Sequence, residues 1–318
     1  MIEMAGETAR LRERLFDDFS SRLARFTGEA VGPFVCPICL ERFTRDVLAA
    51  TPPELTLAHV IPESLGGRFC TLACALCNNE IGSDLEAFLL ERYRAEDAFN
   101  GVGTIAGRME FEFGSVGVEL QAAPPGEPWT VLVIEKQTNP TVLERLNDSI
   151  DAPADGGLAQ VASKIIPRFR NQPSRVSAAL YQSAYLLMFA YFGYDFVFDD
   201  RYRKLREQIL KPDEEILPAT FDVPPEAWAD AMISCSQPHA VMFVKEPTSF
   251  IMPIFRLRPK SGRERVVGVP LPGLDDTAWP NSGPRGKVKG VLVRFRIERD
   301  DGARPSFREL WEQAKRMP

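Results

Sequence analysis

The stretches C-P-I-C at residues 36–39 and C-A-L-C at residues 74–77 bracket the run L-A-H-V-I-P-E-S-L-G-G at residues 57–67. A C-x-x-C pair in a tight turn directs two thiolates at one ion, and zinc prefers four such ligands in a tetrahedron. The two pairs predict a closed structural zinc site that would staple a hairpin to the start of a helix. Its ligands would be Cys36, Cys39, Cys74 and Cys77.

Three other interpretations of the cysteines stay open. Some of them could be buried apolar residues without a metal, because free cysteine is among the most buried residue types. Cys70 could replace Cys74 in a different ligand geometry. A redox dithiol is the weaker alternative, since it needs only one C-x-x-C pair and leaves the other unexplained.

The composition is that of a globular protein. The chain has 318 residues, of which 45% are hydrophobic and 26% charged, and this length allows two domains or one large one. A protein that only coats nucleic acid is usually basic, so with a net charge of −6 any contact with DNA or RNA requires a local basic surface. Zinc in preference to disulfides, and a start without a signal-peptide pattern, favour a reducing, cytoplasmic location.

Hydrophobic periodicity and turn residues predict four regions. Residues 1–33 hold an N-terminal helix that packs against the body of the protein or, as an alternative, forms a homodimer. Residues 34–100 are the cysteine–histidine module, and residues 101–150 are mainly β and pack on it. Residues 151–318 form an α+β accessory or recognition domain, beyond a linker that starts at Asp151.

The most apolar stretch, residues 178–198, is long enough to span a membrane. It also contains Gln182, Ser183 and several tyrosines, and it ends in charged residues. A buried helix at the centre of a soluble domain is the favoured interpretation, so no membrane partner is expected.

The order C-x-x-C, H-V-I-P-x-S-x-G-G and C-x-x-C-N-N-x-x-G-S over residues 34–90 resembles the HNH endonucleases, which belong to the ββα-metal nucleases. The resemblance implies an α+β fold in which a zinc-stapled ββα-metal module is joined to a larger α+β accessory region. It also implies a nuclease that hydrolyses phosphodiester bonds in nucleic acid, with DNA favoured over RNA. A role in bacterial defence is consistent with a nuclease that carries a large accessory domain.

The resemblance assigns roles to individual positions. His59 matches the general base that activates the attacking water, and Asn78 matches the residue that helps to hold the catalytic ion, Mg²⁺ or Mn²⁺. The four paired cysteines match the family's structural zinc site. A histidine titrates near neutral pH, and a hard divalent ion stabilises charge on phosphate, so the implied chemistry is reasonable on physical grounds.

One position departs from the family pattern. The residue before the general base is usually an acid or a histidine that binds the catalytic ion, and here it is Ala58. Three consequences are open: a carboxylate from elsewhere (Glu54, Glu63 or Asp84) completes the ion site, catalysis is weakened, or the module is degenerate and binds a nucleic acid or protein partner without cleavage. A regulatory protein that uses the zinc module only as a structural element is a third function class.

Basic residues gather at 168–175, 201–206 and 284–296. Each cluster could contact phosphates through arginine and lysine, and each could equally be a solvated helix or strand face. His239 follows no motif and is expected to be structural or on the surface.

Overall fold

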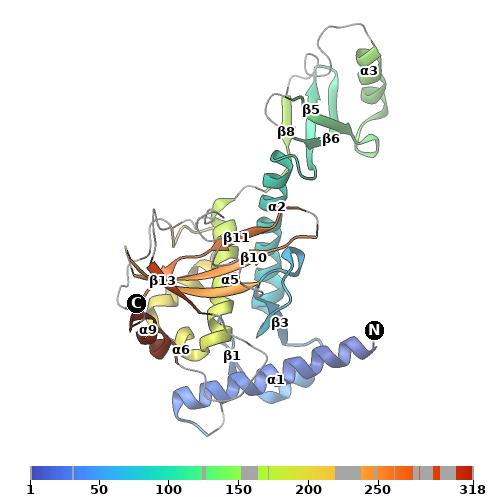
Figure 1. Cartoon of the computed structure of the whole chain (residues 1–318). Helices are drawn as coiled ribbons and strands as arrows, with labels where there is room; N and C mark the ends of the chain where they lie inside the picture. Colours follow the sequence, from blue (N-terminus) through green and yellow to red (C-terminus); the bar gives the residue numbers. More distant parts are fainter. Residues whose placement is uncertain are drawn as a thin grey trace. The chain divides into compact units, whose positions relative to one another are not determined.

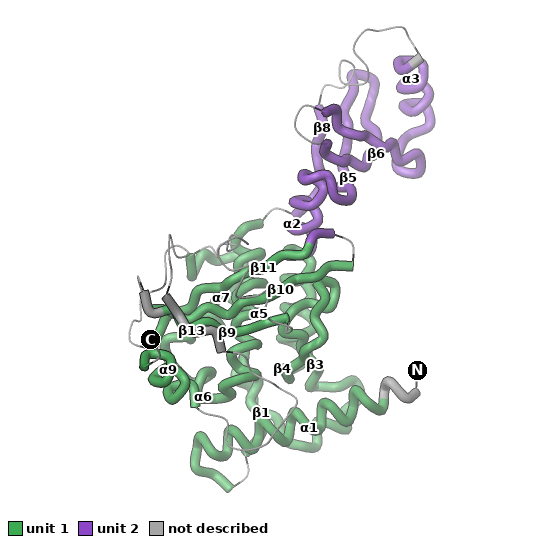
Figure 2. The backbone as a smooth tube through the Cα atoms, in the orientation of Figure 1, with its two compact units in different colours: residues 1–89, 172–260, 264–318 green, residues 90–171, 261–263 purple. Residues whose placement is uncertain are grey.

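The structure is a computed structural model. It describes residues 2–30, 32–123, 127–151, 164–170, 172–218, 238–246, 249–260, 262–274, 279, 289–293 and 306–316. Cys235, nearly all of the predicted linker and most of the basic stretch at 284–296 lie outside these residues. The chain divides into two compact units (Figure 2): unit 1 holds residues 1–89, 172–260 and 264–318, and unit 2 holds residues 90–171 and 261–263. The domain boundaries expected from the sequence stay predictions.

Unit 1 begins with α1 (Ile2–Thr27), which lies in the region 1–33 where the sequence predicts an N-terminal helix. Phe16, Phe19 and Leu23 recur at helical spacing and are buried. The Phe19 ring stacks on Phe189 at a centroid distance of 4.2 Å. The apolar side of α1 is therefore used for packing within the chain.

Two short hairpins and a helix follow α1. Strands β1 (Phe34–Val35) and β2 (Arg42–Phe43) pair antiparallel, and β3 (Leu55–His59) pairs antiparallel with β4 (Cys70–Cys74). A π-helical segment (Leu76–Gly82) then leads into α2 (Ser83–Phe99). This β3–β4–helix order is the expected ββα arrangement, and the whole chain is α+β as predicted (Figure 1).

The accessory part of unit 1 is built around the buried helix α5 (Pro173–Phe192). Its side chains are buried from Ser177 to Phe192, in agreement with the prediction of a buried helix. No helix within the described residues combines the length and apolarity needed to cross a membrane. Pro173 starts α5, and Gly193 ends it with a φ of 61°, where a residue with a side chain would be strained.

An antiparallel sheet and three further helices make up the rest of unit 1 within the described residues. The sheet order is β11-β10-β9-β13, with β12 paired to β10. The Phe243 ring packs against Trp311 at 5.7 Å, so the last helix contacts the sheet. The bounds are α6 (Tyr194–Val197), α7 (Arg203–Leu210), β9 (His239–Glu246), β10 (Phe250–Leu257), β11 (Arg265–Gly268), β12 (Leu271–Pro272), β13 (Lys289–Val293) and α9 (Phe307–Arg316).

Unit 2 is a four-stranded antiparallel sheet in the order β7-β6-β5-β8. Alternate residues of β5 and β6 are buried, and Met109, Val118 and Leu146 belong to one core cluster with the end of α2. This unit therefore has a hydrophobic core of its own. Its bounds are β5 (Ile105–Phe111), β6 (Gly114–Gln121), β7 (Thr130–Val133), α3 (Pro140–Asp151) and β8 (Lys164–Pro167).

His239, at the start of β9, is a structural residue at the junction of three elements. Its ring stacks on Phe69, which precedes β4, at 5.2 Å, and lies 5.8 Å from the Tyr191 ring of α5. The side chain is 4% exposed, and its buried Nδ1 has no hydrogen-bond partner among the residues that the structure describes. Burial lowers the pKa of His239 from 6.5 to about 4, because a charged imidazole cannot be solvated there.

This burial predicts that unit 1 loses stability in mild acid. Below pH 6.5 the unfolded chain binds a proton at His239 that the folded chain refuses until pH falls to about 4. The contribution of neutral His239 is complete above pH 6.5 and falls by about 2 kcal/mol between pH 7 and pH 5.

The measurement is the free energy of urea unfolding at both pH values for the wild type and for His239→Phe, which keeps an aromatic ring but cannot titrate. From pH 7 to pH 5, we expect the free energy of unfolding of the wild type to fall by about 2 kcal/mol relative to that of the variant. A difference that does not change with pH would contradict the assignment, whatever the variant's own stability.

Candidate active site

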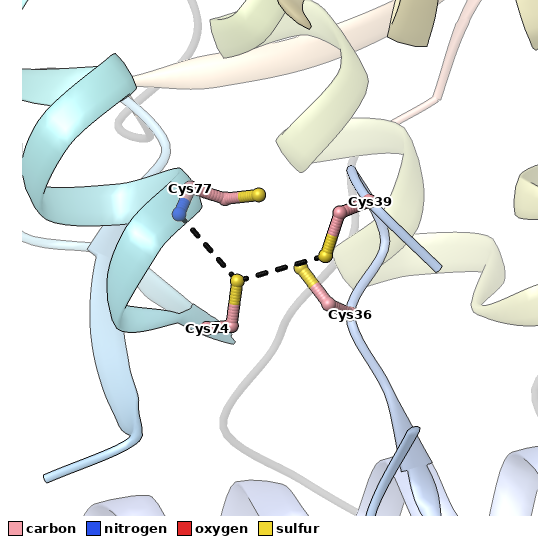
Figure 3. Close-up of side chains that lie close together, drawn as sticks. All are labelled: Cys36, Cys39, Cys74 and Cys77. Atoms are coloured by element: carbon pink, nitrogen blue, oxygen red, sulfur yellow. Dashed lines mark hydrogen bonds between the residues drawn. The ribbon is translucent and has the colours of Figure 1, made fainter. Parts of the chain in front are cut away.

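Four sulfur atoms converge from two sides of unit 1. Their Sγ atoms all lie within 4.8 Å of one another, and the Sγ atoms of Cys39 and Cys74 are 3.7 Å apart. Figure 3 shows Cys36 and Cys39 facing Cys74 and Cys77 across the cluster. Cys70 is not part of it, so the predicted set of four is the set that the structure brings together.

The cluster is compatible with a zinc ion. Four sulfurs at about 2.3 Å from zinc in a tetrahedron are about 3.8 Å from each other, close to the spacing of Cys39 and Cys74. Hydrogen bonds with Cys36 lower the pKa values of Cys39 and Cys74, and that with Cys39 raises the pKa of Cys36. Thiols in contact do not all ionise unaided, and a bound cation would remove this conflict.

Two tyrosines of the accessory helices hold the first cysteine turn. The Tyr185 hydroxyl donates to the carbonyl of Pro37 at 2.8 Å. The Tyr194 hydroxyl donates to the carbonyl of Val35 at 2.8 Å and accepts from the amide of the same residue at 2.9 Å. Both tyrosines are at most 1% exposed, so they satisfy backbone groups that water does not reach.

The ribbon of β3 and β4 places His59 at the end where the connecting loop begins. His59 is opposite Cys70 in the register, and the amide of Val60 donates to the carbonyl of Phe69 at 3.0 Å, which closes the base of the loop. His59 is partly exposed, and within the described residues its imidazole forms no hydrogen bond or ion pair. An accessible ring at the end of a rigid ribbon is suited to accept a proton from a bound water.

Gly67 makes the tight turn of this loop possible. Its amide donates to the carbonyl of Pro62 at 3.0 Å, and a Cβ at this position would lie 1.7 Å from the carbonyl oxygen of Ile61. A larger residue would open the loop that carries His59. This close approach is the steric reason why a glycine is required at position 67 of the motif.

Asn78 ties the π-helical segment to β3. Its Nδ2 donates to the carbonyl of Leu57 at 3.0 Å and to Oγ1 of Thr56 at 2.9 Å. A carbonyl oxygen only accepts, so the amide nitrogen must face the strand and Oδ1 is directed away from it. Asn78 thus fixes the helix two residues from His59 and leaves an oxygen ligand free for a cation.

Ala58 is 1% exposed and lies on the same ribbon face as Thr56, toward Asn78. Of the carboxylates considered as substitutes, Asp84 pairs with Arg175, and the carbonyl of Glu54 accepts from Ala75 at the opposite end of the ribbon. Within the described residues, the cysteine cluster is the sole group of three or more His, Cys, Asp or Glu side chains close enough to share an ion. The described residues therefore form no cluster of carboxylates around His59 that could hold an ion.

Glu63 is at the His59 end of the ribbon, in the short turn that follows Pro62. Burial, and then the charge of Glu63, raise the pKa of Cys70 to about 11, and the same two causes raise the pKa of Glu86 on α2. Sequence reasoning did not single out Glu86, because its proximity to Glu63 depends on the path of the helix.

Two predicted basic clusters are largely engaged within the protein. Arg175 pairs with Asp84 and Asp213. Arg206 donates to the carbonyl of Val197, and Arg201 pairs with Asp199. These contacts favour a structural role for most of the arginines at 168–175 and 201–206 over contact with phosphate.

A basic run that sequence reasoning missed lies beside the His59 loop. Residues 256–265 contain five basic residues and one acidic residue, so a charge count along the chain would have found it. The amide of Arg258 donates to the carbonyl of Leu65 at 2.7 Å, and a Cβ on Gly66 would lie 2.6 Å from the carbonyl oxygen of Arg258. The end of β10 is therefore in contact with the loop that follows His59.

Comparison with known proteins agrees with this geometry. Residues 36–94 match the family model of the HNH endonucleases, so the chain contains an HNH endonuclease domain, and this domain suggests nuclease function. The match spans the four cysteines, His59 and Asn78. No protein of curated function and no solved structure matches the chain.

The cysteine cluster predicts one structural zinc ion per chain. Cys36→Ser and Cys77→Ser should each lose the zinc and destabilise unit 1 by about 3 kcal/mol or more, because a buried ligand and the cross-link are lost together. Released zinc is titrated with a chelating dye, and stability is measured by urea unfolding.

Cys70→Ser is the matched control, since Cys70 lies at the other end of β4. It should retain the zinc and most of the stability. Retention of zinc by both cluster variants, or its loss from the Cys70 variant, would mean that the ligand set is different.

Proposed function

We propose that this protein is a metal-dependent HNH endonuclease that hydrolyses phosphodiester bonds in nucleic acid, DNA being favoured over RNA. The observation that carries the proposal is the bond from Asn78 to the Leu57 carbonyl, which locks the helix against β3 beside His59. The four-cysteine cluster, as a structural zinc site, would hold the other end of the same ribbon. Bacterial defence is a setting consistent with such an enzyme.

In the proposed reaction His59 takes a proton from the water that attacks phosphorus. The new oxygen–phosphorus bond forms as the bond to the leaving oxygen breaks, and solvent water protonates that oxygen. A bound Mg²⁺ or Mn²⁺ would stabilise the negative charge on phosphate and leaving group. Oδ1 of Asn78 would be a ligand for that ion, and the ribbon keeps base and ligand at a fixed separation.

This proposal predicts that cleavage depends on His59. With Mg²⁺ or Mn²⁺ the wild type should nick plasmid DNA, and His59→Ala should be slower by about 10²- to 10⁴-fold, the range of a general base. Structured RNA is assayed in parallel, and EDTA should stop the reaction.

Arg203→Ala, on the exposed side of α7, is purified identically and should cleave like the wild type. Equal cleavage by the wild type and His59→Ala would point to a contaminant or to another site and would remove His59 from the mechanism.

A second candidate function is a binding module without cleavage, and Ala58 is the observation that favours it. The described residues hold no cluster of acids around His59, so an ion there would lack the usual charged ligand. In this case zinc is retained, nucleic acid or a protein partner is bound, and His59→Ala changes little.

Restoring the acid at position 58 tests the role of Ala58. A carboxylate is a strong ligand for Mg²⁺, so Ala58→Asp should lower the Mg²⁺ concentration for half-maximal cleavage by about tenfold. The measurement is a Mg²⁺ titration of the initial cleavage rate, after thermal unfolding has shown that the variant folds.

Ala58→Asn has nearly the same size without the charge and is the matched control. If Ala58→Asn and Ala58→Asp shift the titration equally, a carboxylate at this position is not what the ion site lacks. No cleavage by any of these proteins, with zinc bound, would support the binding module.

A further inference from the structure

The basic residues at the end of β10 form a surface that the proposed mechanism does not use. The chain as a whole is acidic, with a net charge of −6, yet residues 256–265 carry five cations and one acid. Arg258 and Lys260 are exposed, and Arg256 is partly exposed. Phe255, before Arg256, and Leu257, between the two arginines, are buried, so alternation along the strand directs the two arginines to the same side.

This surface belongs to the same compact unit as the ribbon of β3 and β4 that carries His59. Residues 256–260 and 264–265 are in unit 1, and the bond from Arg258 to Leu65 joins β10 to the His59 loop. Arg68 lies in that loop, between the glycine pair and β4, and is exposed. It forms no ion pair within the described residues. Cations from the loop and from the strand therefore border the same site.

The arginines already bind one anion of the chain. Glu264 pairs with both Arg256 and Arg258, and its Oε2 is 2.8 Å from Nε of Arg258. A carboxylate between two guanidinium groups occupies the place that two phosphate oxygens would take, since arginine binds both anions with the same donors. All of these side chains are partly or fully exposed, so a phosphate could displace Glu264.

We propose that this basic surface, formed by Arg68, Arg256, Arg258 and Lys260, binds the sugar–phosphate backbone of DNA beside the His59 loop. The inference rests on the proposed nuclease function and adds the element that holds the substrate. Contacts of this kind give affinity without sequence preference and depend strongly on salt.

The test measures binding by fluorescence anisotropy of a labelled DNA duplex to full-length, zinc-loaded His59→Ala protein, in which cleavage is disabled. Adding Arg258→Glu should weaken binding by about tenfold at about 0.1 M salt and reduce the salt slope by about one. Adding Glu264→Gln should strengthen binding about threefold, because it frees two guanidinium groups.

Arg203 and Glu207 on α7 provide a matched control pair, with Nε of Arg203 3.5 Å from Oε1 of Glu207 and a similarly exposed arginine. Arg203→Glu and Glu207→Gln make the same changes in net charge, and both should bind within about twofold of the parent protein. Equal effects in the two pairs, or no effect of the Arg258 and Glu264 changes, would overturn the inference and leave the nuclease proposal intact.

Two outcomes separate the inference from the proposed function. DNA binding that responds to the Arg258 and Glu264 changes, by a protein whose wild type does not cleave, supports the surface and rejects the nuclease. A protein that binds neither the DNA duplex nor a structured RNA of equal length rejects both. Tighter binding of RNA that responds to the same Arg258 and Glu264 changes would assign the surface to RNA instead of DNA.

Discussion

The candidate site depends on the convergence of two cysteine pairs; the sulfurs of Cys39 and Cys74, one from each pair, are 3.7 Å apart although they are 35 residues apart in sequence. The short strands around them, two residues long in β1 and β2, could not hold that position by backbone pairing alone. A cation shared by the four sulfurs would join the first turn to the end of β4 and to the helix that follows. His59 and Asn78 take their relative position from that same ribbon and helix.

The accessory helices complete the first cysteine turn. The hydroxyl of Tyr194 satisfies both the amide and the carbonyl of Val35, and Tyr185 satisfies Pro37, in a region with no water access. Leaving such groups unpaired costs about 1–3 kcal/mol each. Residues more than 140 positions away thus help to hold the first cysteine turn. This gives a physical reason for the Gly193–Tyr194 pair, because the positive φ of Gly193, which a glycine adopts without strain, ends α5 and turns the chain into the helix of Tyr194.

Local chemistry made much of the structure predictable. The C-x-x-C spacing predicted the four sulfurs that meet, and the hydrophobic pattern predicted α1 and α5. Contacts between separate elements of the fold could not be predicted. No pattern in the sequence shows that Arg206 bonds Val197, that His239 is buried against Phe69, or that β10 reaches Leu65. These contacts are set by tertiary packing, which local sequence does not encode.

The alanine at position 58 and the basic surface are connected through the affinity for the substrate. Ions such as Mg²⁺ in nucleases are usually held by one or two carboxylates together with phosphate oxygens of the substrate. Where the acid before the general base is absent, the ion contributes less to substrate affinity before the phosphate arrives. Protein cations must then supply more of the attraction for a polyanion, against the repulsion of a chain with a net charge of −6. In the proposed nuclease, Arg258, fixed to the His59 loop through its own backbone, would do this without entering the proposed proton transfer.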